Sequence, residues 1–230
     1  PADSGGSRGV TLVRKPEDLQ KAIVSAIEWS SKKTVMVEQF IEGREFSVES
    51  ISYKGEHFVL QITDKVTTGS PHFIELAHHQ PAVLRKKQWN DIKELTLKTL
   101  KALKIEYGAS HTEVKIDPIG NPYVIEMGPR MGGDFISSDL VRLSTGYDFV
   151  KGVLEIATGQ FNEPQFGQQN CSGVYFLSKE TEMGVMPYIQ NKDKHSFIFD
   201  ADIYGSIRNI QCNSDRSGYF IYKNDKRINV

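Results

Sequence analysis

The stretch that decides the fold is His111-Thr-Glu-Val-Lys-Ile116, then Asp117-Pro-Ile-Gly-Asn121, then Pro122-Tyr-Val-Ile-Glu-Met-Gly-Pro-Arg130. The outer pieces are rich in β-branched and aromatic residues, and the middle piece is a turn sequence. The pattern predicts two strands joined as a tight hairpin. With the turn centred near Ile119 and Gly120, Glu113 and Glu126 fall roughly opposite each other.

This hairpin predicts a cation site. Facing side chains on paired strands lie about 5 Å apart, and two carboxylates at that spacing repel each other unless a cation offsets them. Oxygen ligands of this kind suit Mg²⁺ or Mn²⁺. Arg130 follows in a glycine-containing loop, where it could stabilise an anion beside the metal. The alternative is a solvated acidic pair on the polar face of an ordinary hairpin.

Composition excludes several function classes. The chain has 230 residues, 39% of them hydrophobic, enough for one core or for a core plus a small satellite domain. With 28 basic and 29 acidic residues, it has no basic excess for nucleic-acid binding. No run approaches the roughly 20 apolar residues of a membrane helix. Cys171 and Cys212 have no CxxC partners; a disulfide between them stays open, and low cysteine usage favours the cytoplasm.

Working outward from the hairpin, the periodicity predicts an α+β chain. Helices are expected from Pro16 to about Trp29, over 89–103, and near 138–143 and 147–157. Strands are expected over 10–13, 34–40, 45–53, 57–66 and 74–79. These elements form a predicted domain over 1–160. Segment 161–170, rich in Asn, Gln, Gly and Pro, reads as a linker. Strands over 172–178, 197–204, 207–211 and 219–222 then predict a small β-rich domain over 171–230.

Taken together, these motifs resemble the ATP-grasp superfamily over about residues 1–157. The most similar branch contains the carboxylate–amine (amino-acid) ligases, with relatives in carbamoyl phosphate synthase and biotin carboxylase. The resemblance implies antiparallel sheets with flanking helices, and ATP and Mg²⁺ (or Mn²⁺) as cofactors. It implies that Glu113 and Glu126 are metal ligands and that Arg130 is the catalytic arginine. The family often has an Asn where this chain has Gly128, so one metal is expected to rely more on waters and phosphates.

Two upstream segments resemble the nucleotide site of that family. In Val37-Glu-Gln-Phe-Ile-Glu-Gly-Arg-Glu45, the resemblance places Glu38 at the adenine amino group and Glu45 at the ribose hydroxyls. Gln39 and Ile41 supply backbone contacts on either side of Phe40. In the loop over 4–9, the resemblance places Ser7, Arg8 and Gly9 over the phosphates, because glycines let backbone N–H groups turn toward phosphate oxygens. For the first segment, the alternative is a plain hairpin that turns at Gly43. For the second, the alternative is an ordinary loop.

A further segment, Phe73-Ile-Glu-Leu-Ala-His-His-Gln-Pro81, resembles a family segment near the substrate carboxylate. There His78 would orient that carboxylate by a charge-assisted hydrogen bond. An ordinary loop histidine is the competing interpretation. Lys65 is a looser candidate for contacting an anion.

The resemblance implies an ATP-dependent ligase that activates a carboxylate as an acyl phosphate for attack by an amine. Two alternatives stay open: phosphorylation of bicarbonate, as in carbamoyl phosphate synthase or biotin carboxylase, and a nucleotide-binding regulatory module without turnover. The expected partners are the carboxylate, the amine and a second copy of the chain, with neither nucleic acid nor membrane. Because the chain starts at Pro1, one residue after an expected lysine, it reads as a fragment lacking an N-terminal domain, inactive alone.

Overall fold

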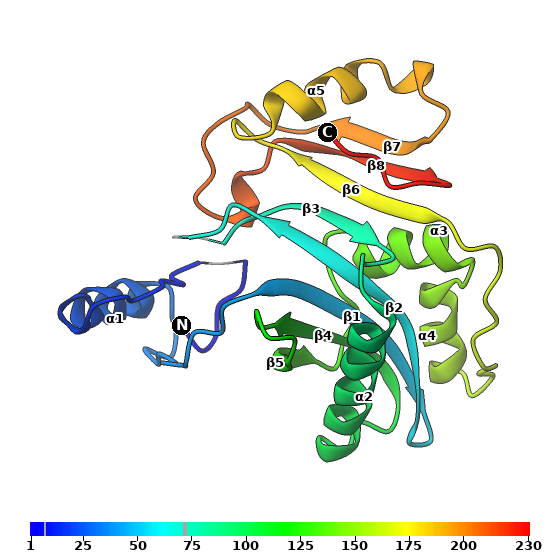
Figure 1. The fold of residues 1–230 in the computed structure, drawn as a ribbon, viewed down its shortest axis with the longest axis horizontal. Helices are drawn as coiled ribbons and strands as arrows, with labels where there is room; N and C mark the ends of the chain where they lie inside the picture. The colour runs from blue at the N-terminus through cyan, green and yellow to red at the C-terminus, as the bar shows by residue number, and fades with distance from the viewer. Residues whose placement is uncertain (7, 71–72) are drawn as a thin grey trace.

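The computed structural model describes residues 1–6, 8–70 and 73–230. Eight strands form a single sheet in the order β5-β4-β1-β2-β3-β6-β8-β7, and every pairing is antiparallel. Figure 1 shows this sheet as the centre of the molecule, with helices on both of its faces. The strands are β1 (Arg44–Tyr53), β2 (Glu56–Thr67), β3 (Glu75–Gln80), β4 (Gly108–Ile116), β5 (Pro122–Gly128), β6 (Cys171–Leu177), β7 (Ile198–Ile203) and β8 (Gly218–Asn224).

The helical elements lie between and beyond these strands. They are η1 (Pro16–Asp18), α1 (Leu19–Glu28), α2 (Lys86–Ala102), the π-helix η2 (Ile136–Leu140), α3 (Val141–Thr145), α4 (Phe149–Ala157), α5 (Glu182–Gln190), η3 (Lys192–Lys194) and η4 (Asn213–Asp215). No helix in the described part of the chain is both long enough and apolar enough to cross a membrane.

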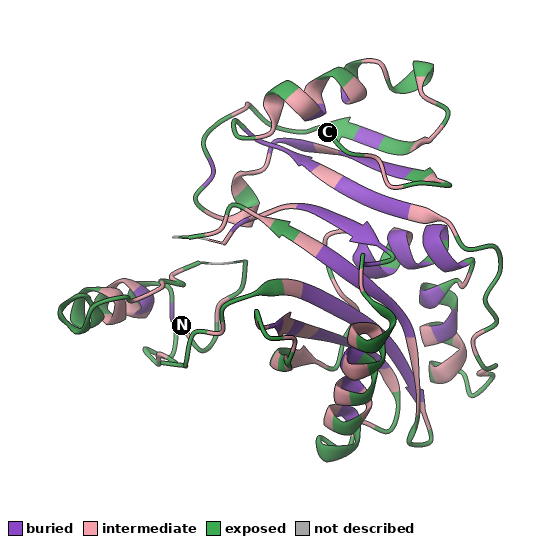
Figure 2. Cartoon of the chain, viewed as in Figure 1, coloured by how far each residue is buried: buried purple, intermediate pink, exposed green. Residues whose placement is uncertain are grey.

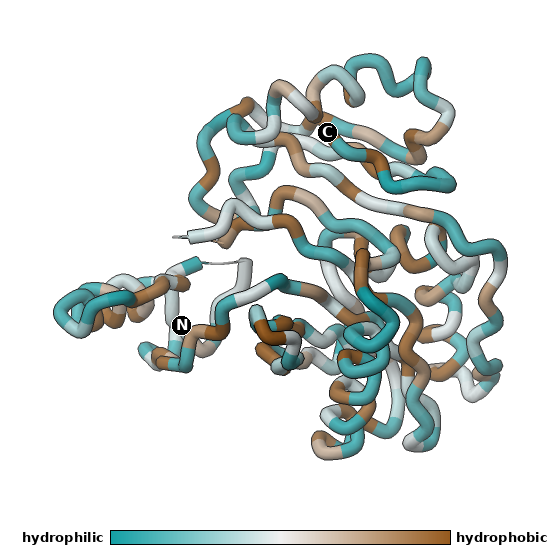
Figure 3. Tube along the Cα trace, viewed as in Figure 1, coloured by the Kyte–Doolittle hydropathy of each residue, from teal (hydrophilic) through white to brown (hydrophobic). Residues whose placement is uncertain are grey.

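Side chains alternate between the two faces of the sheet, and the register fixes which face each residue occupies. On one face, α2 covers Phe46, Val48 and Val114, and α5 covers Phe220 and Tyr222. In α2, apolar residues recur at helical spacing, so one side of the helix packs on the sheet while its polar side faces solvent. The alternating colours along this helix in Figure 3 reflect that amphipathic pattern.

The opposite face, which we call the polar face, carries Glu113, Lys65 and His78. The register aligns Ser47 with both Glu113 and Thr63, and Lys65 with His78 and then Val174, so all of them point to one side. The loop after β5 and the helices η2, α3 and α4 pack over the ends of this face. The polar side chains therefore lie between the helix-covered ends of this face.

The N-terminal segment differs from the prediction. Helix α1 forms where the pattern placed it, but 10–13 and 34–40 contain no strand. Figure 2 shows this segment as mostly exposed or half-buried, in contrast to the buried inner strands. Met36 and Val37 are 61% and 70% exposed. The β-branched residues of 34–40 have no neighbouring strand with which to pair, so their strand propensity is not realised.

The C-terminal segment also departs from the prediction in two elements. Residues 207–211 form no strand, and α5 was not expected from the pattern. The strands of 171–230 extend the common sheet, since β6 pairs with β3 from Ala77–Tyr175 to Gln80–Ser172. Segment 161–170 is therefore a connection within one sheet, and the division into domains stays a prediction. Cys171 and Cys212 are free thiols.

Candidate active site

The β4–β5 hairpin has the predicted register: Glu113 lies opposite Glu126. Both side chains therefore project from the polar face, at the edge of the sheet. Their surroundings differ. Glu113 Oε1 accepts a hydrogen bond from Lys65 Nζ at 2.8 Å, whereas Glu126 is exposed and has no hydrogen-bond or ion-pair partner among the described residues. The two carboxylates form an open acidic pair that fits a hydrated divalent cation.

Lys65 of β2 connects three carboxylates. Its Nζ lies 3.0 Å from Glu45 Oε1, 3.0 Å from Glu75 Oε1 and 2.8 Å from Glu113 Oε1, and its side chain is only 3% exposed. Burial disfavours the charged ammonium, but the carboxylates of Glu75, Glu113 and Glu45 outweigh burial and raise the pKa of Lys65. Burial raises the pKa of the Glu113 carboxyl, but His111 and Lys65 outweigh burial and lower it. Lys65 is therefore a fixed positive charge.

A second chain of contacts supports Glu113 from behind. His111 Nδ1 lies 2.5 Å from Glu49 Oε1, and His111 Nε2 lies 3.6 Å from Glu113 Oε1. Glu49 is fully buried and also accepts hydrogen bonds from Ser137 Oγ and, at 3.3 Å, from the Gly132 amide. Burial lowers the pKa of His111, but the neighbouring carboxylates of Glu113 and Glu49 outweigh burial and raise it to about 9. The imidazole is thus held as a cation beside Glu113.

Gly132 makes this arrangement possible. A Cβ added there would lie 2.6 Å from His111 Nδ1 and 2.8 Å from Glu49 Oε1, which is closer than non-bonded atoms approach. The loop after Arg130 can reach the polar face because this position has no side chain.

A cavity of about 230 Å³ opens beside these charges, at the start of β1. Glu45 and Lys65 lie on its polar side, and Phe40 and Phe73 on its aromatic side, with ring centroids 5.8 Å apart. Lys115 Nζ lies 4.7 Å from the centre of the Phe40 ring. The cavity therefore combines aromatic surface, two ammonium groups, the Arg44 guanidinium and the carboxylates of Glu45 and Asp64. Two of its lining residues, Phe40 and Glu45, are predicted nucleotide contacts.

The other predicted nucleotide contacts make fewer interactions with the rest of the chain. Glu38 and Gln39 are exposed, outside any strand. The Ile41 carbonyl accepts a hydrogen bond from Lys115 Nζ at 3.3 Å, so this carbonyl borders the cavity. None of these contacts tests the predicted adenine roles, which stay predictions.

The glycine-rich loop lies close to the polar face. Ser7 is outside the described residues, and Arg8 Nε donates to the Gly5 carbonyl at 2.9 Å. At Gly9, a Cβ would lie 2.9 Å from Trp29 Cδ1. At Gly6, a Cβ would lie 3.8 Å from Asn213 Cβ, so the loop reaches the segment beside Glu75. Its predicted position over the phosphates is compatible with this geometry and stays a prediction.

Arg130 is exposed at the end of the hairpin, and its Nη1 donates to the Met131 carbonyl at 2.9 Å. Its side chain folds back over Gly128, where an added Cβ would lie 3.2 Å from Arg130 Cγ. Because Gly128 has no side chain, the Arg130 side chain can occupy this position.

Sequence reasoning missed three residues of this site. Asp134 follows Arg130 in the glycine-containing loop and forms two hydrogen bonds with the Arg216 guanidinium, at 2.9 and 2.6 Å. Glu49 is buried in the middle of β1. The acidic residue after Gly132-Gly133 was a usable signal for Asp134, whereas nothing local marks Arg216, which the fold brings from the C-terminal segment.

Known proteins share sequence and fold with this chain. A family model described as an ATP-grasp domain matches residues 1–139. D-alanine–D-alanine ligase B of Clostridium perfringens (strain 13 / Type A) is 29% identical over 136 residues, which are 57% of this chain and 43% of that protein. The chain spans less than half the length of the curated relatives it matches.

Two solved structures share the fold. The L-amino acid ligase from Bacillus licheniformis superposes with a TM-score of 0.75 at 24% identity, covering 94% of this chain and 56% of that one. The biotin carboxylase of Campylobacter jejuni, in a beta-gamma-ATP complex, gives a TM-score of 0.72 at 20% identity, covering 98% and 53%.

Proposed function

This chain belongs to the ATP-grasp family, and we propose that it is part of an ATP- and Mg²⁺-dependent ligase. The proposed reaction transfers the γ-phosphate of ATP to a substrate carboxylate. The resulting acyl phosphate is attacked by an amine, which forms an amide and releases phosphate.

The observation that carries this proposal is the pairing of Glu113 with Glu126 beside the cavity lined by Phe40, Glu45 and Lys65. An open carboxylate pair suits a cation that also binds phosphate oxygens, and an aromatic wall with an adjacent carboxylate suits a nucleoside. Both features lie on one side of the sheet, so a nucleotide in the cavity can direct its phosphates toward the pair.

The residues of the chain would divide the work as follows. Glu113 and Glu126 would hold Mg²⁺, which supplies charge neutralisation between the phosphates and the transferred group. Lys65 and His111 keep Glu113 ionised and fixed in position. Arg130, exposed next to Glu126, would contact the transferred phosphate and the reacting carboxylate, because a guanidinium stays charged throughout and binds anions in a bidentate manner.

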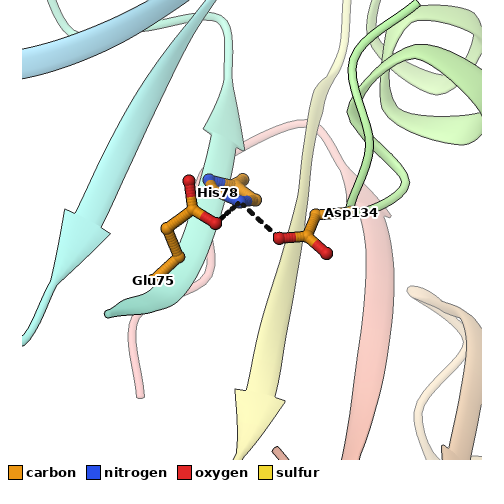
Figure 4. A group of neighbouring side chains, drawn as sticks. All are labelled: Glu75, His78 and Asp134. Atoms are coloured by element: carbon orange, nitrogen blue, oxygen red, sulfur yellow. Dashed lines mark ion pairs between the residues drawn. The ribbon is translucent and has the colours of Figure 1, made fainter. Parts of the chain in front are cut away.

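Glu38, Gln39, Phe40 and Ile41 would border the adenine, and Glu45 would accept from the ribose hydroxyls. The loop containing Ser7, Arg8 and Gly9 would cover the phosphates. His78 would orient the substrate carboxylate together with Arg130. Its Nε2 lies 4.0 Å from Glu75 and 3.7 Å from Asp134 (Figure 4), and Lys65 and Arg216 balance the charges of these two carboxylates.

The test is Mg-ATP-dependent phosphate release against pools of amino acids, other carboxylates and bicarbonate, using this chain and any longer form of the protein. We expect release that requires an organic acid and an amine, and a loss of about 100-fold or more in Glu126→Ala. Glu56→Ala, which removes an exposed glutamate at the far end of β2, is the matched control and should keep full activity.

The same assay separates the alternatives. Release driven by bicarbonate alone would replace the ligase with a carboxylase-type phosphorylation; the structural relative from Campylobacter jejuni is named a biotin carboxylase. Mg-ATP binding with no release from any pool would favour a regulatory module. Equal activity of Glu126→Ala and the parent chain would contradict the assigned metal site.

We further propose that the active protein includes an N-terminal domain before Pro1, in keeping with the greater length of the relatives. The free thiols of Cys171 and Cys212 support a cytoplasmic location. A homodimer is a third proposal, which sedimentation of the longest available form would test. Robust ligase activity from these 230 residues alone would contradict the proposed missing domain.

A further inference from the structure

Residues 225–230 fold back over the sheet after β8, and we call them the C-terminal strap. The strap lies on the face that α2 and α5 cover, because Ile228 packs there against the cluster that includes Phe220 and Tyr222. Tyr175 Oη donates a hydrogen bond to the Ile228 carbonyl at 2.8 Å. Figure 1 shows the C-terminus beside α5. The strap is therefore anchored to the sheet at its middle.

Arg227 extends from the strap to β2, past β6 and β3 in the strand order. Its Nη1 donates a hydrogen bond to Asp64 Oδ2 at 2.8 Å, between residues 163 positions apart in the sequence. Asp64 is 5% exposed. It also accepts hydrogen bonds from Arg44 Nη2, at 2.7 Å, and from the Val83 amide, at 2.9 Å. One buried carboxylate thus joins the strap, the start of β1 and the loop after β3.

Asp64 and Arg44 belong to the wall of the cavity beside Phe40 and Glu45. Two guanidinium groups share the single negative charge of Asp64, so Asp64 leaves one positive charge unbalanced on this wall. The Arg44 side chain is 56% exposed, and its Nη1 donates to the uncharged Val83 carbonyl at 3.1 Å. An unbalanced cation beside a cavity attracts an anionic ligand.

The contact of Arg227 with Asp64 is partly shielded from solvent. The Arg227 side chain is 27% exposed and the Asp64 side chain is 7% exposed. Salt and water screen such a pair less than they screen a fully exposed one. If Arg227 moved away, the charge of Asp64 would neutralise Arg44 alone. Both the position of Arg44 and the charge on the cavity wall therefore depend on the strap.

We propose that the C-terminal strap sets the nucleotide affinity of the cavity, with Arg227 as a positioning residue that acts through Asp64 and Arg44. This inference rests on the proposed function, because it takes the cavity as the nucleotide site. It adds a link between that site and residues 225–230. Coupling between two sites is reciprocal. A docked strap therefore favours nucleotide binding, and bound nucleotide favours docking of the strap.

Calorimetric titration with Mg-ATP, in the longest available form of the protein, tests the first direction. Arg227→Met should weaken Mg-ATP binding at least about fivefold, the lower end of typical couplings between sites. Arg227→Lys keeps a cation that can donate to Asp64 and should stay within about twofold of the parent protein. The matched control Lys226→Met removes an exposed charge from the same strap and should leave the affinity unchanged.

Hydrogen exchange over 225–230 tests the reverse direction in the parent protein, without any substitution. Saturating Mg-ATP should slow exchange in the strap at least about fivefold, because docking protects its amides. Thermal melting of each variant establishes that it is folded; if Arg227→Met does not fold, the exchange measurement decides. A residue that only stabilised the fold would lower the melting temperature and leave Mg-ATP affinity unchanged.

Phosphate release separates this proposal from the proposed function. Mg-ATP binding that weakens in Arg227→Met, with no phosphate release from any pool, would contradict the ligase and support the strap. Equal Mg-ATP affinity of Arg227→Met and the parent, or strap exchange that does not respond to Mg-ATP, would overturn the strap and leave the ligase in place. A parent protein that binds no Mg-ATP would overturn both.

Discussion

The centre and the edge of the polar face differ in how their charges are paired. At the centre, Lys65 is buried among three carboxylates and Glu49 is fully buried with three donors. At the edge, Glu126 and Arg130 are exposed, and Glu126 has no partner among the described residues. The two regions are one strand apart, because Glu113 and Glu126 face each other across the hairpin.

This difference separates charges that hold the fold of the site in place from charges that are available to bind a ligand. Charges at the centre are neutralised within the chain, so their removal is expected to reduce folding stability. Charges at the edge are open to ligands, so their removal is expected to reduce binding while the fold is unaffected. The proposed metal site joins both kinds: it would hold Glu113 rigidly and leave Glu126 free to adjust to the phosphates.

The largest effect is expected for Lys65→Met. This change leaves Glu45, Glu75 and Glu113 close together without their shared cation, and such uncompensated buried charge costs about 3–5 kcal/mol. Urea unfolding should show this loss. Lys98→Met, which removes an ion pair that is 71% exposed on the lysine side, is the control and should cost no more than about 1 kcal/mol. Similar losses in both variants would contradict the distinction between centre and edge.

A smaller effect comes from pH, through a histidine on the other face of β3. Burial, assisted by Arg227 and His78, lowers the pKa of His79 to about 3. At pH values below about 6.5, the ordinary pKa of histidine, His79 is protonated in the unfolded chain but stays neutral in the native state. Stability should therefore fall by about 1.4 kcal/mol per pH unit as the pH drops from 6.5 toward 3.

The contribution of His79 is measured by comparing the unfolding free energies of the parent chain and of His79→Gln at pH 6.5 and at pH 5. The parent should lose about 2 kcal/mol more than the variant. His111 has the opposite shift, and its contribution is present below pH 6.5 and lost as the pH rises toward 9. The two histidines therefore act in separate pH ranges, and parallel curves for parent and variant between pH 5 and 6.5 would contradict the assignment.

The smallest effect on stability is expected at the edge. Glu126→Gln removes an exposed, unpaired carboxylate and should change the unfolding free energy by less than about 0.5 kcal/mol without Mg²⁺. In the presence of Mg-ATP, the parent should gain melting temperature and the variant should gain much less. A large loss of stability without ligand would show that Glu126 has a structural partner.

The sequence allowed prediction of the hairpin, its register and the ATP-grasp fold, which the family match confirms. These features depend on local patterns: a turn sequence, alternating strands and amphipathic helices. The strand expected over 34–40 was wrong because a strand requires a neighbour, and residue types alone do not specify one.

The parts of the site that could not be predicted depend on distant contacts. Arg216 reaches Asp134 from the C-terminal segment, and Asn213 reaches Glu75. Lys65 was named only as a loose candidate, since its importance comes from three carboxylates on three other strands. The roles of Glu38, Gln39, Arg130 and His78 stay predictions.

The continuity of the sheet across β3 and β6 has a consequence for truncation and for assembly. If residues 171–230 were removed, the backbone N–H and C=O groups of β3 that now bond to β6 would lie at an open sheet edge. Open edges recruit strands from other molecules and promote aggregation. The C-terminal strands thus act as a protective cover for the interior of the sheet, and a shortened chain would tend to associate with itself.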